Sequence, residues 1–342
     1  MKKPLFIIYL VMIYQMTIQA QAVYVDSNTG DDKNSGTKES PVYSVGKAAE
    51  IIRRKDNDIY TMKINPGIYV LDSHVLVSTE KDMTEKRILI EAGILPGDPS
   101  WTPEKMPVIT SKTMKGEIPV SETFVVGFLI DESHVTVRGL KFHGYFYPNT
   151  RYFPIARLNK TKTDLSVEQC MFIGDENISQ IQAGVLAHGN EIKIDHCIFY
   201  KLRNTVVFWE DAGNGIKNGN ALTNSIIFGA SQAVWTVAPD IDFKFKNNIV
   251  SNCKYVWVRN NFNTTKNYSI ENCIIVNNQH YKGIAESPVL VIPAEFEIKE
   301  TNVIKEGEIS LRLIENVDAP LPIDYMHIIP DTPGYETGAG IF

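Results

Sequence analysis

The sequence predicts an all-β fold, a single-stranded right-handed parallel β-helix, on the basis of three observations. Seven segments share one pattern and place a residue each in a matching column: Leu140, Cys170, Cys197, Ser225, Asn248, Cys273 and Thr301. The intervals between these residues are 30, 27, 28, 23, 25 and 28, and a repeat of this length is typical of a solenoid. Each segment alternates apolar with polar residues, which indicates strands rather than helices. The right-handed form follows from the strong preference of parallel crossovers.

The first 22 residues have the pattern of a secretory signal peptide. Lys2 and Lys3 precede an apolar stretch at residues 5–13, and residues 20–22 read Ala-Gln-Ala, a small-x-small cleavage site. The apolar stretch is too short to span a bilayer, and no cysteine at the cleavage point could carry a lipid. We therefore expect a secreted or periplasmic protein with no membrane partner.

The net charge argues against one class of partner, and the positions of the cysteines indicate their structural role. The formal charge of −6 becomes −8 once Lys2 and Lys3 are removed, and a surface of that sign does not suit nucleic acid. Three of the four cysteines share the repeat column with leucine, serine, asparagine and threonine, which favours small buried stacking residues. Cys170 and Cys197 would lie about 5 Å apart on consecutive coils, so a disulfide between them remains an alternative.

Residues 23–342 are expected to form one monomeric domain. Residues 23–70 would supply an N-terminal cap and the first strands, residues 71–310 the coils, and residues 311–342 a C-terminal cap. Ser44 is a predicted N-cap, and the apolar stripe that follows predicts an amphipathic helix. Its members are Ala48, Ala49, Ile51 and Ile52. Such a helix would cover the open strand edge at that end.

Asparagine recurs just before the repeat column, at Asn224, Asn247 and Asn272. Stacked asparagines on successive coils can form a ladder of side-chain hydrogen bonds. We therefore predict a structural role for these three residues.

The N-terminal segments also carry a family resemblance. The strand and acidic loop YVDSNTGDDKNSGT precede the predicted helix, and Asn65-Pro66-Gly67-Ile68-Tyr69 follows it. In this order they resemble the secreted bacterial right-handed β-helix proteins of the pectate-lyase-like superfamily. The stretches RILIEAG and PVIT look similar to the early coils of chondroitinase-B-like and alginate-lyase-like polysaccharide lyases. The resemblance implies the fold strongly and the chemistry weakly, because the superfamily contains lyases, hydrolases, epimerases and non-catalytic adhesins.

A second strand in each coil predicts a solvent-facing wall, because alternate side chains point to opposite sides of a strand. Its first position holds Arg157, Leu186, Phe208, Trp235, Trp257 and Leu290. Its second position holds Asn159, His188, Glu210, Val237, Arg259 and Ile292. Rows about 5 Å apart would form a ladder of aromatic and charged groups suited to sugar rings. The predicted partner is an acidic polysaccharide, and the alternative is that a loop covers the aromatic residues.

The resemblance to chondroitinase-B-like lyases implies a specific chemistry. It assigns Lys217 as the base, with Glu210 and Asp211 as ligands of a Ca²⁺ ion that neutralises the substrate carboxylate. The catalytic site of the lyase would consist of Glu210, Lys217, His188 and Arg259. Residues 233–237 read Ala-Val-Trp-Thr-Val, where these lyases are expected to carry Arg-His-Gly, so Arg259 is the nearest substitute.

Two other activities are compatible with the same wall. A glycoside hydrolase needs two carboxyl groups, and Glu210 or Asp211 could pair with Asp240 or Asp242, which also count as substrate-binding residues. A non-catalytic carbohydrate-binding or surface-structural β-helix would need only the aromatic side chains. The leading prediction is a polysaccharide lyase that acts by β-elimination.

Overall fold

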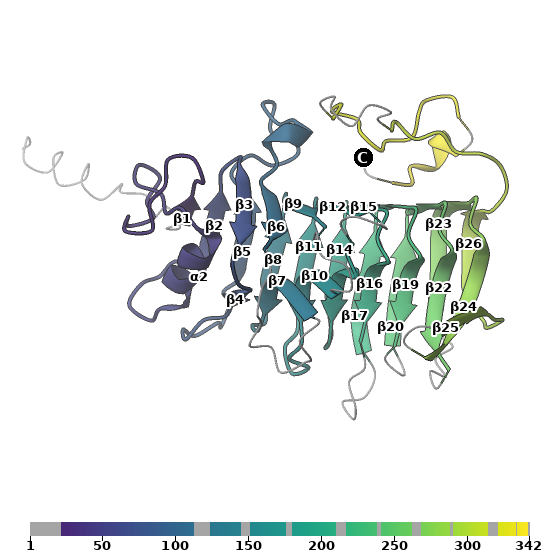
Figure 1. Ribbon diagram of the computed structural model, residues 1–342. Helices are drawn as coiled ribbons and strands as arrows, with labels where there is room; N and C mark the ends of the chain where they lie inside the picture. The colour runs from purple at the N-terminus through teal and green to yellow at the C-terminus, as the bar shows by residue number, and fades with distance from the viewer. Residues whose placement is uncertain are drawn as a thin grey trace, which may run out of the picture.

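The computed structural model describes residues 22–112, 124–144, 151–175, 180–209, 217–237, 241–261, 268–287, 290–313, 321–332 and 334–340, without the side chains at 217, 218, 241 and 242. Apart from Ala22, the predicted signal peptide lies outside this part of the chain. The described residues form a parallel β-helix, as predicted (Figure 1). In the described part of the chain, no helix is both long enough and apolar enough to cross a membrane.

The strands stack in three rows that run along the solenoid. Row one contains β1 (Ala22–Val25), β2 (Thr61–Ile64), β5 (Ile88–Ala92), β8 (Val135–Arg138), β11 (Leu165–Glu168), β14 (Ile192–Asp195), β17 (Lys217–Thr223), β20 (Ile241–Lys246), β23 (Tyr268–Val276) and β26 (Lys299–Ile304). Row two contains β3 (Ile68–Leu71), β6 (Val108–Ser111), β9 (Lys141–His143), β12 (Met171–Ile173), β15 (Ile198–Tyr200), β18 (Ile226–Phe228) and β21 (Ile249–Ser251), and it ends on the second half of β23.

Row three forms a separate sheet. It contains β4 (Val75–Val77), β7 (Phe124–Ile130), β10 (Arg151–Arg157), β13 (Ala183–Ala187), β16 (Asn204–Phe208), β19 (Gln232–Thr236), β22 (Tyr255–Asn260), β24 (His280–Ser287) and β25 (Leu290–Pro293). Each coil passes from row one to row two to row three. The last pair differs from the rest, because β25 runs antiparallel to β24. Leu290 and Ile292, which we assigned to the stacked wall, therefore lie in a returning strand.

The predicted repeat column is confirmed from Leu140 to Cys273 and wrong on the last coil. The pairs on either side of the column keep a constant register through β8, β11, β14, β17, β20 and β23. On the final coil Cys273 pairs with Val303, and Thr301 pairs with Glu271. Thr301 lies two residues before Val303, the true member of the column, so the predicted residue still points to the same side of the strand.

The turn between rows one and two explains the asparagine column. From the coil of β8 onward, one residue in each of these turns has a positive φ: Gly139, Gln169, His196, Asn224, Asn247, Asn272 and Asn302. Glycine and asparagine tolerate this left-handed conformation best. The amide of Asn247 donates to Asn224 Oδ1 at 2.9 Å, and that of Asn272 donates to Asn247 Oδ1 at 2.8 Å. The predicted ladder is confirmed, and Asn302 extends it with a bond of 2.6 Å to Asn272.

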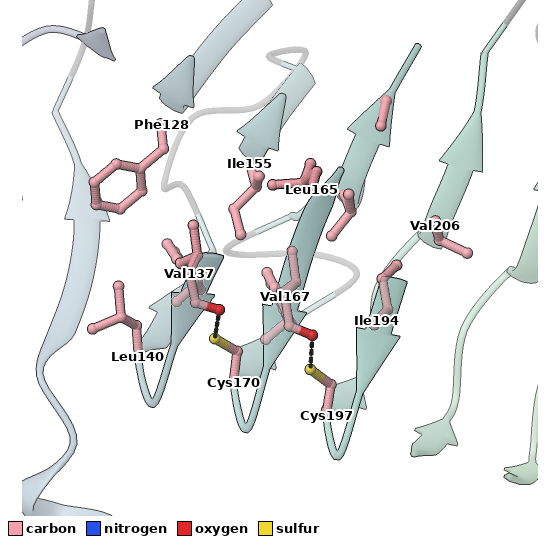
Figure 2. Close-up of a cluster of buried hydrophobic side chains, with 14 of the residues drawn as sticks. Phe128, Val137, Leu140, Ile155, Leu165, Val167, Cys170, Ile194, Cys197 and Val206 are labelled. Atoms are coloured by element: carbon pink, nitrogen blue, oxygen red, sulfur yellow. Dashed lines mark hydrogen bonds between the residues drawn. The ribbon is translucent and has the colours of Figure 1, made fainter. Parts of the chain in front are cut away.

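The interior of the solenoid is apolar and stacked coil upon coil (Figure 2). Phe142, Phe172 and Phe199 of row two lie face to face, with ring centres 5.0 and 4.9 Å apart. Cys170 and Cys197 are buried free thiols that point at the carbonyl oxygens of the preceding coil. The alternative of a disulfide is therefore wrong, and the cysteines act as small packing residues.

Helix α2 (Val45–Arg53) covers the N-terminal end of the solenoid. Ser44 is its N-cap, and Ser44 Oγ accepts a hydrogen bond from Lys47 N at 3.1 Å. Asp32 fixes the cap in turn, because its carboxylate accepts from Ser44 N at 2.8 Å and from Ser44 Oγ at 2.7 Å. The apolar stripe of the helix is buried, so both the helix and its capping role are confirmed.

The C-terminal segment turns back and runs along the outside of the solenoid (Figure 1). Gly340 N donates to Asn247 O at 2.8 Å, and Asn272 Nδ2 donates to Thr337 O at 3.0 Å. Its apolar residues cover the outer side of row two, where they cluster with isoleucines such as Ile226 and Ile249. The segment thus lies along the coils, whereas we expected it to cover the last one. The short 3₁₀ helices η2 (Pro103–Lys105) and η3 (Tyr335–Thr337) belong to the irregular segments outside the rows.

Candidate functional site

A groove of about 230 Å³ lies on the outer face of row three, across β7, β10, β13, β16 and β19. We call it the aromatic groove. Its described lining residues are Phe124, Val126, Arg151, Phe153, Leu158, Gln182, Leu186, His188, Arg203, Asn204, Val207, Trp209 and Trp235. Apolar and aromatic side chains dominate, with a few polar groups among them, which is the usual composition of a small-ligand site.

The aromatic rings stand at both ends of the groove. Phe124 and Phe153 stack with ring centres 5.3 Å apart. Trp209 and Trp235 meet edge to face, with ring centres 6.3 Å apart. Trp235 is held in place because its Nε1 donates to Asn260 Oδ1 at 2.8 Å. Trp209 is 40% exposed and offers its surface to a ligand.

The ionisable side chains among the groove's described lining residues are all basic. The Arg151 guanidinium lies 5.4 Å from the centre of the Phe124 ring. Burial lowers the pKa of Arg203, and the neighbouring positive charge of Arg151 lowers it further. The His188 ring lies 6.4 Å from that of Trp209. No aspartate or glutamate is among the described lining residues, so the arrangement favours an anionic ligand.

Row three does not alternate strictly, and this irregularity determines which residues reach the groove. Ala233 and Val234 are consecutive in β19, yet both belong to the interior cluster. The next residue, Trp235, therefore faces outward. A strand with two successive inward residues shifts every later side chain to the opposite face from the one that simple alternation predicts.

Three predicted wall residues are buried, and their assignment to the surface is wrong by one position. Arg157 pairs with Ala187, Phe208 with Thr236, and Trp257 with Val234. All three predicted residues are at most 1% exposed. Their neighbours occupy the outer column instead: Ala156, Leu186, Val207, Trp235 and Val258. Because the other side of each strand faces the core, Arg157, Phe208 and Trp257 cannot contact a polysaccharide.

The structure brings two of the predicted site residues together, His188 and Trp235. It also reveals Trp209, which sequence reasoning missed by one residue when Glu210 was aligned with His188. Arg151 and Arg203 were missed as well, because they stand at or just before the start of a strand. A correct register for row three would have found Trp209 from the sequence, since Trp209 N bonds to Ala187 O and thus stands opposite His188.

Arg259 lies away from the groove. It pairs with Thr236 in the inward column, and its guanidinium stands 4.7 Å from the ring centre of Phe296. The structure therefore does not place Arg259 beside His188, as the predicted catalytic set required.

The remaining predicted residues fall outside the description. Glu210, Asp211 and Asp240 are not among the described residues, and Lys217 and Asp242 are described only as backbone in β17 and β20. Among the described side chains, no three of His, Cys, Asp or Glu gather closely enough to hold a metal ion. The predicted calcium ligands Glu210 and Asp211 thus stay a prediction.

Fold and groove together define a parallel β-helix protein with an aromatic, basic groove on one sheet. No protein-family model matches the sequence, and no curated protein sequence matches it. Among solved structures, the complex of XylC with xylose is similar with a TM-score of 0.52 at 10% identity, over 77% of this chain and 63% of that one. A rhamnogalacturonan lyase matches with a TM-score of 0.40 at 12% identity, over 77% and 70%. This chain thus spans less than two thirds of the XylC chain, and the likeness is one of fold.

Proposed function

We propose that this protein is a carbohydrate-active β-helix that binds an acidic polysaccharide in the aromatic groove. The observation that carries the proposal is that Arg151 and Arg203 line the same groove without a carboxylate among the described lining residues, and that the charge of Arg151 helps to lower the pKa of Arg203. Two guanidiniums that repel each other are stabilised when an anion lies between them. A uronic acid provides a carboxylate for that position.

The aromatic side chains suit the rest of a sugar. The faces of a pyranose ring carry C–H groups, which can pack on the exposed surface of Trp209. The polar edge of the sugar carries hydroxyl groups, which can donate to Asn204. Asn204 Oδ1 is buried and has no hydrogen-bond partner among the described residues, although its Nδ2 donates to Gln182 O at 2.7 Å. A buried acceptor without a donor costs free energy, and a ligand hydroxyl that donates to Asn204 Oδ1 would remove this cost.

The finer proposal is β-elimination with His188 as the base. In this reaction the base takes the C5 proton, the C4–O bond breaks, and the electron pair leaves with the departing oxygen, which must acquire a proton. Negative charge develops on the carboxylate side of C5, where Arg151 and Arg203 would stabilise it. His188 is the imidazole that lines the groove, and imidazole is suited to proton transfer near neutral pH. Lys217 remains the alternative base.

Export and calcium dependence belong to the same proposal. The signal-peptide pattern of the first 22 residues supports action outside the cytoplasm. Calcium bound by Glu210 and Asp211 would neutralise the substrate carboxylate, and a comparison of activity with and without a chelator tests this. The proposed roles of His188, Arg151 and Arg203 do not depend on the metal.

The test is a panel of uronate oligosaccharides: galacturonates, mannuronates and guluronates, and glucuronate-containing glycosaminoglycans. Binding is measured by tryptophan fluorescence, and elimination by the ultraviolet absorbance of the unsaturated product. We expect binding to an acidic member, with weaker binding to its methyl ester, and at least a tenfold loss in the variant R151Q/R203Q. The matched control is R54Q, because Arg54 is exposed near the helix end and should not affect binding.

Each activity predicts a different result in this panel. Unsaturated product that disappears in H188A supports elimination, and product that disappears only in K217A assigns the base to Lys217. New reducing ends without that absorbance would indicate hydrolysis instead. Binding without any product would indicate a non-catalytic carbohydrate-binding protein. Failure of every acidic member to bind would overturn the proposal.

A further inference from the structure

A second cavity of about 380 Å³ adjoins the aromatic groove, at the corner where row two leads into row three. We call it the basic pocket. Its lining includes Lys201, Arg203, Ser231, Gln232 and Lys254. Arg203 also lines the aromatic groove, so the two cavities share a wall.

The cations of the basic pocket stand on two coils, with Lys201 and Arg203 in the turn between β15 and β16 and Lys254 two coils further along. Asn204, Gln232 and Tyr255 are in register on three successive strands. The residues just before them, Arg203, Ser231 and Lys254, therefore occupy equivalent positions on those coils. Two steps of strand spacing separate the backbones of Arg203 and Lys254 by about 10 Å. The serine between them is small and leaves the space between the two cations open.

The positive charge of the basic pocket is not neutralised by the described residues. None of Lys201, Arg203 and Lys254 forms an ion pair with a described carboxylate. Lys201 Nζ lies 5.2 Å from the Tyr200 ring centre, and Lys254 Nζ lies 5.9 Å from that of Tyr255. Asp175 is the one acidic residue among the described lining. Among the described lining residues, three cations to one anion leave a net positive charge.

A buried acceptor supplies an independent indication of a ligand. Gln232 is 8% exposed, and its Oε1 has no hydrogen-bond partner among the described residues. A buried carbonyl oxygen without a donor is costly. Because Gln232 lines the pocket, a hydroxyl group of a bound sugar could donate to it. Asn204 shows the same feature in the aromatic groove, one coil away.

We propose that the basic pocket is a second anionic subsite, which binds another acidic group of the same polysaccharide chain. The inference rests on the proposed function of the aromatic groove and defines its ligand more closely. The ligand is a polyanionic chain that crosses the shared wall at Arg203 and carries a carboxylate or sulfate in each cavity. A chain with a single acidic group would occupy the aromatic groove alone.

Chain length separates the two sites experimentally. The probes are the dimer and hexamer of galacturonate, together with a chondroitin sulfate hexamer to compare carboxylate with sulfate. Calorimetric titrations at low salt compare the unaltered protein with K201Q/K254Q. The matched control K38Q/K55Q removes two lysines that are exposed elsewhere on the chain. Circular dichroism and the melting temperature establish that all variants are folded.

We expect K201Q/K254Q, which removes two of the three cations of the pocket, to bind the preferred hexamer about tenfold more weakly. Dimer binding should change by less than about twofold, and the control should match the unaltered protein. Unchanged hexamer affinity in K201Q/K254Q would overturn the subsite and leave the aromatic groove intact. An equal loss for dimer and hexamer would also overturn it, because the lysines would then serve the first site. Absence of binding by the unaltered protein would remove the proposed function and the subsite together.

Discussion

Arg157 donates a hydrogen bond from Nε to the main-chain oxygen of His188, one coil further along, at 2.8 Å. Its Nη2 donates to Asn190 O at 2.9 Å. The guanidinium is completely buried, and burial lowers the pKa of Arg157 to about 10, so the group remains charged at neutral pH. A buried cation thus braces the turn that carries His188 on the rim of the groove.

The first prediction concerns the contribution of Arg157 to the stability of the fold. The variant R157M keeps the apolar stem but removes the donors to two part-buried carbonyl oxygens, those of His188 and Asn190. Each lost hydrogen bond is worth about 1 to 3 kcal/mol. We expect the free energy of unfolding to fall by about 3 kcal/mol, measured by chemical denaturation. R54M, at an exposed position, should change it by less than about 0.5 kcal/mol. Equal stability of R157M and the unaltered protein would show that the turn does not depend on Arg157.

The second prediction separates Trp257, which the sequence analysis placed on the wall, from Trp209, which it missed. Trp257 is fully buried, with ring centres of Phe243 and Tyr268 at 5.2 and 4.8 Å, so W257A should lose about 3 to 5 kcal/mol of stability. Trp209 is 40% exposed in the groove, so W209A should retain most of its stability and bind acidic oligosaccharide about tenfold more weakly. Denaturation and titration of both variants test the assignment, which a stable W257A would contradict.

The sequence predicted the parallel β-helix because its signal repeats seven times. Leu140, Cys170 and Cys197 are separated by nearly a constant interval, and each small or apolar residue packs on the next. Where the sequence of one coil fits the pattern poorly, the other coils still define the repeat. Helix α2 could also be predicted from the sequence, because a cap at Ser44 and an apolar stripe are both local features.

The groove was harder to predict, because it depends on the face to which single residues point. Alternation holds in row one, but two consecutive inward residues in row three, such as Ala233 and Val234, interrupt it. A slip of one residue then put Phe208 in the predicted wall in place of Val207, and Glu210 in place of Trp209. Arg151 and Arg203 carry no local signal at all, since only the coil geometry brings them together.

The third prediction is a pH dependence at the start of the asparagine ladder. Burial alone would raise the pKa of Asp195, but hydrogen bonds from Thr223, Asn224 and His196 outweigh it, and the pKa is lowered. Asp195 Oδ1 accepts from Asn224 Nδ2 at 2.8 Å. A carboxyl whose pKa is lower in the folded state stabilises the fold above its unfolded value, near 3.9, and loses that contribution as the pH falls through the folded value.

The variant D195N isolates this effect, because asparagine can still accept from Asn224 but does not titrate. We expect the melting temperature of the unaltered protein to exceed that of D195N near pH 6, with the difference shrinking below about pH 4. D72N is the control, since Asp72 is an exposed carboxylate paired with Lys112. Parallel curves for D195N and the unaltered protein would show that the ladder does not depend on the ionised carboxylate.

The last prediction concerns Gly189, which follows His188 directly. Its φ is +84°, and a Cβ at this position would lie 2.3 Å from the carbonyl oxygen of Lys162 and 3.3 Å from Arg157 Nη2. Backbone cannot move aside as a flexible side chain can, and a positive φ adds strain for any residue with a Cβ. We expect G189A to lose about 2 kcal/mol or more of stability, and to weaken binding in the groove because the turn beneath His188 must shift.

G46A provides the matched control, because a Cβ on Gly46 of α2 meets nothing nearer than Ser44 Oγ at 4.0 Å, and alanine favours the helix by about 0.5 to 1 kcal/mol. Opposite signs for the two variants in denaturation would support the constraint at Gly189, whereas a G189A protein as stable as G46A would contradict it.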